Sequence, residues 1–77
     1  MQADEIQLLL HKAPFEPFTI HMANGRKFLI DHREIAMFSL NKKSLAVAMH
    51  PGGFAILDLH LATHTEPEHK PSRGRKR

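Results

Sequence analysis

The stretch FTIHMANGRKFLI, residues 18–30, decides the fold. On both sides of Asn24-Gly25 the apolar residues recur at every second position, which is the period of a β-strand with one buried face. Asn-Gly is a strong hairpin signal because both residues tolerate a positive φ. The stretch therefore predicts a β-hairpin whose buried face carries Phe18, Ile20, Met22, Phe28 and Ile30.

A different period precedes the hairpin. Apolar residues spaced i, i+3, i+4 and i+7 lie on one face of a helix, and here they are Ile6, Leu9, Leu10 and Ala13. Acidic residues precede this stripe, where a helix N-terminus favours negative charge. Pro14 follows it, and the residue before a proline is pushed out of the helical region. We expect a helix of about three turns that is stable only when its apolar face is docked.

Strand patterns continue after the hairpin, over residues 35–40, 44–50, 54–57 and 62–65. Residues 58–61 resemble a short helical turn. In the strand over residues 44–50, one face carries Leu45, Val47 and Met49 and the other carries Ala46 and Ala48, so we expect contacts on both faces. The elements together predict a mainly β fold led by one α-helix, arranged as a small five-stranded antiparallel barrel or a strongly bent sheet.

The net charge of +3 is confined to the C-terminal end. Residues 1–65 hold six basic and six acidic residues, so the excess positive charge lies within residues 66–77. That segment contains prolines and a glycine but no large apolar side chain, and such a composition cannot form a core. We expect one helix-led β-barrel domain over residues 1–65 and a disordered basic tail over residues 66–77.

The order of these elements resembles that of Sm-like and SH3-like small barrels. The hairpin over residues 18–30 corresponds to their first hairpin, with Asn24-Gly25-Arg26 at its turn, and residues 58–61 correspond to their short helical turn before the last strand. The resemblance implies a bent, barrel-like sheet. For Sm-like proteins it also implies association through edge strands.

A second resemblance rests on the connector Pro14-Phe15-Glu16-Pro17-Phe18, which follows Leu8-Leu9-Leu10. Together with Thr19-Ile20-His21-Met22, Gly25-Arg26 and the corner His32-Arg33-Glu34, it is similar to an uncharacterised family of short bacterial proteins. The family implies a fold and a bacterial source, and it implies no activity. Arg33 stands where that corner often carries proline, so the rigidity that a proline ring would give the corner is not implied here.

The tail carries the sharpest chemical pattern. Its Arg-Gly-Arg core resembles an AT-hook, in which glycine lets the backbone approach the minor groove and guanidinium groups meet its negative potential. A lysine replaces the proline that normally follows this core, so the extended geometry is not preset. The alternative is a solubilising tail. The candidate nucleic-acid-binding residues are Lys70, Arg73, Gly74, Arg75, Lys76 and Arg77.

Two other patterns suggest chemistry that we do not assign. Among seven histidines, His60 and His64 have a helical metal-ligand spacing, but residues 62–65 have a strand pattern and no carboxylate completes a set, so we predict neither a metal nor a cofactor. The corner Asp31-His32-Arg33-Glu34 could support acid–base catalysis, but a charged solvated turn explains it as well. A chain of this size has little room for a pocket. We predict no enzymatic activity.

All the aromatic side chains are phenylalanines. Strand alternation predicts core positions for Phe18, Phe28, Phe38 and Phe54, which argues against a surface that stacks nucleic-acid bases. Phe15 lies in the connector and could belong to an interface.

Composition excludes several classes of protein. Cysteine is absent, so there is no disulfide framework and no thiolate site. No apolar run reads as a leader or a membrane span, and we expect the cytoplasm. The sequence favours a small noncatalytic binding or interaction module, self-associating or with an unknown protein partner. The alternative is a nucleic-acid-binding protein, Sm-like or acting through its tail.

Overall fold

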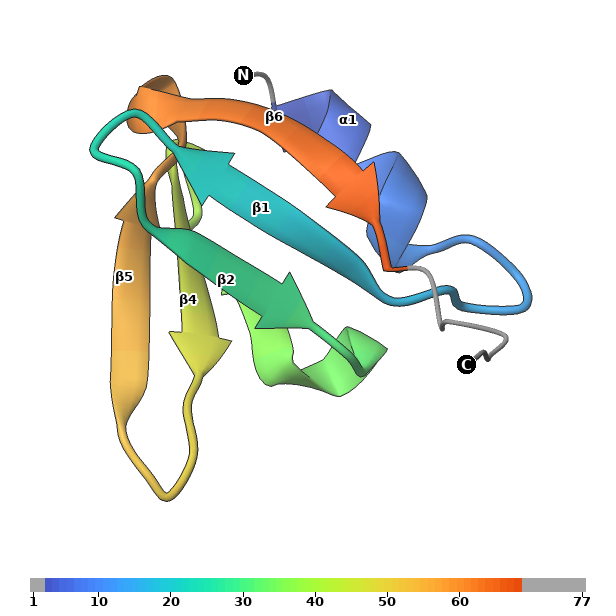
Figure 1. Cartoon of the computed structure of the whole chain (residues 1–77). Helices are drawn as coiled ribbons and strands as arrows, with labels where there is room; N and C mark the ends of the chain where they lie inside the picture. The colour runs from blue at the N-terminus through green and yellow to red at the C-terminus, as the bar shows by residue number, and fades with distance from the viewer. Residues whose placement is uncertain (1–2, 69–77) are drawn as a thin grey trace, which may run out of the picture.

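The computed structural model describes residues 3–68 and is mainly β, with one N-terminal helix (Figure 1). In chain order its elements are α1 (Ala3–Leu10), β1 (Phe18–Met22), β2 (Lys27–Ile30), the 3₁₀ turn η1 (Arg33–Ile35), β3 (Ala36–Phe38), β4 (Ser44–Ala48), β5 (Phe54–Asp58), the 3₁₀ turn η2 (Leu59–Leu61) and β6 (Ala62–Pro67). The predicted helix, hairpin, helical turn and later strands are all present, although several of their ends differ from the prediction.

The strands form two three-stranded antiparallel sheets, with the orders β2-β1-β6 and β3-β4-β5. Six strands lie within residues 3–68, in agreement with the six strand patterns of the sequence, whereas the predicted barrel counted five. The hydrogen-bonded ladders of the two sheets are separate in this part of the chain, so a closed barrel is not confirmed. In Figure 1 the β4–β5 hairpin extends away from the β2-β1-β6 sheet, with its turn at the bottom of the view.

The predicted β1–β2 hairpin is confirmed, but its turn is longer than a two-residue Asn-Gly turn. The Met22 amide donates to the Arg26 carbonyl (2.8 Å), and the Gly25 amide donates to the Met22 carbonyl (3.0 Å). Gly25 alone in this turn has a positive φ, of 89°. Asn24 instead accepts a hydrogen bond at Oδ1 from the Arg26 amide (2.9 Å), which is the usual way an asparagine stabilises a turn.

Helix α1 is shorter than predicted. Ile6 and Leu10 are buried as their spacing indicates, but the helix ends at Leu10, and Ala13 is exposed. The Arg33 guanidinium donates hydrogen bonds to the carbonyl oxygens of Leu10 and Lys12, the second at 2.7 Å. These acceptors at the end of the helix are therefore satisfied by a side chain from the charged corner, and no further helical turn is needed.

One core joins α1 to the inner faces of both sheets. Its buried members are Ile6, Leu10, Phe18, Ile20, Phe28, Ile30, Leu45, Val47, Leu57, Leu59 and Ala62. The hairpin residues predicted to face the core are buried, except for Met22, which is half-buried. The two sheets are thus held together by shared side-chain packing even though no ladder joins them in the described residues.

The prediction for Phe54 is wrong. The other predicted core aromatics are buried or half-buried against the core, namely Phe18, Phe28 and Phe38. Phe54 is 69% exposed. Residue 55 pairs with Val47 and residue 57 with Leu45, so the register of β5 on β4 turns Ala55 and Leu57 inward. A run of apolar residues fits either phase of the alternation, and the neighbouring strand decides between them.

The ends of two strands also differ from the prediction. β4 ends at Ala48, and Met49 is exposed instead of sharing the buried face of the strand. β6 continues through Glu66 and Pro67, which were assigned to the tail. Glu66 lies opposite Thr19 of β1, and backbone pairing of this kind requires no large apolar side chain.

Candidate binding surfaces

The outer face of the β3-β4-β5 sheet is apolar except at one end, where Ser44 of β4 pairs with Asp58 of β5. Strand register places Met37 beside Ala46 and Ala46 beside Ile56, and it places Phe54 beside Ala48. Met37, Phe54 and Ile56 are 67%, 69% and 68% exposed, respectively. We call Met37, Ala46, Ala48, Phe54 and Ile56 the apolar face.

Side-chain size varies in a simple way across the apolar face. The central strand contributes only the methyl groups of Ala46 and Ala48, whereas the edge strands β3 and β5 contribute the larger side chains of Met37, Phe54 and Ile56. The face is therefore a shallow trough along β4 between two ridges, and none of its side chains carries a charge. On the inner side of β4, Leu45 and Val47 are buried, so contact is confirmed there. Contact on the outer side stays a prediction.

The outer face of the β2-β1-β6 sheet is polar apart from Leu29, which lies opposite Thr19 and is exposed. His21 of β1 lies directly opposite His64 of β6, and their imidazole rings stack with centroids 4.3 Å apart and planes 5° apart. His21 Nε2 lies 2.8 Å from Glu66 Oε1. On the other side of β1, Lys27 of β2 lies opposite His21. Ligand atoms of His21, His64 and Glu66 all lie within 4.8 Å of one another, which would suit a metal ion.

Sequence reasoning considered His64 with His60 and missed this group. His60 lies in η2 and is not a member of it. His21 and Glu66 are 45 residues apart and meet only because β6 returns to pair with β1. Strand alternation placed His21 on the outer face, but the register of β6 on β1 could not be read from the sequence.

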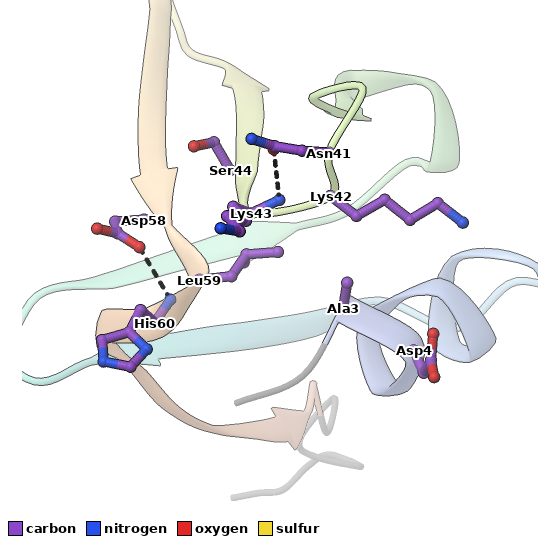
Figure 2. Close-up of a pocket in the computed structure, with 9 residues that line it drawn as sticks. All are labelled: Ala3, Asp4, Asn41, Lys42, Lys43, Ser44, Asp58, Leu59 and His60. Carbon is purple, nitrogen blue, oxygen red and sulfur yellow. Dashed lines mark hydrogen bonds between the residues drawn. The ribbon is translucent and has the colours of Figure 1, made fainter.

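A broad open hollow of about 780 Å³ lies between the β3–β4 turn, η2 and the start of α1 (Figure 2). Its polar side chains do not converge, because Asp58 and His60 lie on the β5 side while Lys42 and Asp4 lie toward α1. Asn41 Oδ1 accepts from the Lys43 amide (3.0 Å), and Asp58 Oδ1 accepts from the His60 amide (2.9 Å). These oxygens stabilise local turns, and the hollow shows no catalytic arrangement among the labelled residues.

The charged corner has a structural role through Arg33. Its guanidinium holds the end of α1, as described above, and lies 5.5 Å from the centroid of the Phe15 ring. Phe15 in turn contacts Phe18, with ring centroids 6.2 Å apart. The connector and the corner are thus fixed to each other and to the core.

A smaller hollow, of about 330 Å³, adjoins His32 in the same corner. Asp31 and His50 also line it, but Glu34 does not. Among residues 3–68, no hydrogen bond joins His32 to either carboxylate of the corner. The His32–Glu34 pair considered for acid–base catalysis is therefore not assembled as a pair in this part of the structure.

The candidate nucleic-acid-binding residues Lys70, Arg73, Gly74, Arg75, Lys76 and Arg77 lie outside the described residues. Within residues 3–68, no helix combines the length and apolar character needed to cross a membrane. No family model matches the chain, and neither a curated protein nor a solved structure matches it. The Sm-like and bacterial-family resemblances therefore stay predictions.

Proposed function

We propose that this protein is a small noncatalytic binding module that self-associates, with the apolar face of one copy packed on the apolar face of another. The observation that carries this proposal is the exposure of Met37, Phe54 and Ile56, each about two-thirds exposed on one contiguous surface. Single exposed apolar side chains are common on proteins. A contiguous exposed patch instead marks an interaction site.

The chemistry of the apolar face favours a second copy as its occupant. Asp58 lies on the same side of the sheet, at the end of β5. The five side chains of the face itself are uncharged, so a two-fold axis through it brings no like charges together. Its trough of alanines can receive the ridge formed by Phe54 and Ile56 of the partner copy, and the partner's trough receives the same ridge in return. Sheets pack face to face in this way in β-sandwiches. A chain of 77 residues also buries only a modest share of its surface alone and gains from such a contact.

We further propose that the two sheets are halves of one strongly bent, Sm-like or SH3-like sheet. The order of elements supports this, since η2 directly precedes β6 and β6 returns to pair with β1. Sm-like proteins associate through strand edges. Association through an edge would leave the apolar face exposed, so variants of that face distinguish the two modes.

The test is sedimentation velocity of the full chain at increasing concentration. The wild type is expected to shift from monomer to dimer, and Ile56→Lys is expected to remain a monomer because a charge would be buried in the contact. The matched control is Leu8→Lys, which makes the same change at an exposed apolar position on α1 and should associate like the wild type. A wild type that stays monomeric at high micromolar concentration contradicts the proposal. Association that is equal in Ile56→Lys and the wild type contradicts it too.

A further inference from the structure

The polar outer face of β2-β1-β6 carries a second arrangement, which does not depend on self-association. His64 and Glu66 are two residues apart on β6 and therefore project from the same side of the sheet, beside His21 of β1. The His21 side chain is 24% exposed and that of Glu66 is 61% exposed, so the group is open to solvent. Two imidazoles and one carboxylate form the ligand set of open zinc sites, in which the fourth position holds water or substrate.

Thr63 determines which nitrogen of His64 is available. The pairing of β1 with β6 shifts register between His21 and Met22, and the Thr63 hydroxyl lies at this irregularity. The hydroxyl donates its one hydrogen to the His21 carbonyl oxygen (3.1 Å). It also lies 3.0 Å from His64 Nδ1, where it can then only accept. Nδ1 of His64 therefore carries a hydrogen, and in the neutral ring the lone pair is on Nε2.

We propose that His21, His64 and Glu66 bind a divalent transition metal of the zinc class. Metal-bound histidines commonly donate their second ring N–H to an outer oxygen, and Thr63 provides that oxygen for His64. His21 binds through Nε2, where the ion takes the place of the hydrogen shared with Glu66. The stacked rings must open on binding, because the in-plane lone pairs of parallel rings do not converge.

The required movement is small at the His21–Glu66 pair. Two ligand atoms on one tetrahedral zinc ion are about 3.3–3.6 Å apart, given bond lengths of about 2.0–2.2 Å. His21 Nε2 and Glu66 Oε1 are 2.8 Å apart, so these two partly exposed side chains need to separate only slightly. Lys27 opposes binding, since it is a cation opposite His21 on the same face. Glu68 lines the same hollow as Lys27 and Glu66 and partly offsets that charge.

The experiment is calorimetric titration of the full chain with Zn²⁺ alone, with Mg²⁺ as a hard-cation control. Saturable one-to-one binding of Zn²⁺ is expected. His64→Gln and Glu66→Gln should each weaken it by at least about tenfold, the loss that even an outer-shell change can cause. His60→Gln is the matched control, because it removes an exposed imidazole outside the group and should bind like the wild type.

Two further variants test whether the Thr63 hydroxyl orients the His64 ring for metal binding. Thr63→Val should weaken Zn²⁺ binding by about tenfold, and Thr63→Ser should retain it because the hydroxyl is kept. Amide spectra of the metal-free variants verify that each is folded. The proposal is overturned by wild-type affinity in both His64→Gln and Glu66→Gln, by the absence of saturable Zn²⁺ binding up to millimolar concentration, or by equal uptake of Mg²⁺.

Discussion

The two sheets have inner faces of the same kind and outer faces of opposite kinds. Inside, both contribute aliphatic and aromatic side chains to a single core. Outside, the β2-β1-β6 sheet presents mainly polar side chains, such as Thr19, His21 and Glu66, with Leu29 among them. The β3-β4-β5 sheet presents mainly apolar ones, such as Met37 and Ile56, with Asp58 at one end. The first pattern is that of an antiparallel sheet with one face in water, and the second is that of a sheet covered on both faces. One small domain thus carries a polar surface, which we propose binds a metal ion, and an apolar surface, which we propose packs on a second copy.

The largest expected effect is on the free energy of unfolding, and it distinguishes a phenylalanine on the inner face of a sheet from one on an outer face. Phe28 of β2 is 6% exposed, and Phe28→Ala should lower the free energy of unfolding by about 3–5 kcal/mol through lost burial and a cavity. Phe54→Ala should lower it by less than about 1 kcal/mol in dilute solution, because that side chain is already in solvent. Urea unfolding at low protein concentration measures both. Equal losses would show that the register of β5 is not as described.

A lysine at matched positions of the two outer faces should change association on one face only. Ala46 and Thr19 are both half-buried, and each lies on the outer face of the central strand of its sheet. Ala46→Lys places a charge in the trough and should weaken dimer formation by at least about tenfold, which corresponds to about 1.4 kcal/mol. Thr19→Lys places the charge opposite Glu66 and should leave association unchanged. Sedimentation equilibrium compares them, and equal loss in both variants would remove the distinction between the faces.

The His21–Glu66 hydrogen bond on the polar face should contribute little to stability. Glu66→Gln removes the carboxylate beside His21 and, without metal, should cost about 0–1 kcal/mol, because polar contacts between side chains that water reaches contribute little net free energy. Thermal unfolding in the presence of a chelator measures this cost. A loss of several kcal/mol would mean that the pair is a structural element of the sheet and not an adaptable surface group.

Deleting the basic C-terminal residues should have the smallest effect on thermal stability. Deleting residues 70–77 should not change the thermal midpoint, because the buried core members among residues 3–68 lie within residues 6–62 and residues 70–77 include no large apolar side chain. The same deletion tests the nucleic-acid alternative, since the folded part has no excess of basic residues. Weak, salt-dependent binding of DNA or RNA at low salt should disappear with the tail. An affinity for DNA and RNA that does not change on deletion would show that the tail is not the source of the binding.

The sequence predicted those elements that local pattern determines. The alternation through residues 18–30 located the first hairpin, and the spacing of Ile6 and Leu10 located the helix face. It could not predict features that depend on pairing between distant strands. Phe54 and Ala55 fit a strand in either phase, and only the register on β4 places Phe54 outside.

Both candidate surfaces depend on such long-range pairing. The apolar face exists because three strands align Met37, Ala46 and Ile56 in one row. The histidine group exists because β6 pairs with β1, and no motif spacing connects residues 45 positions apart. The two-sided apolar character of the strand over residues 44–50 was the signal in the sequence that indicated a contact at the outer face of β4.

The most direct test of the central claim is the concentration dependence of the amide spectrum of the full chain. Our account predicts that concentrating the protein shifts or broadens the amide signals of Met37, Ala46, Phe54 and Ile56, while those of Thr19 on the polar face stay in place. Shifts confined to the outer face of β2-β1-β6, or a spectrum that does not change up to millimolar concentration, would contradict self-association through the apolar face.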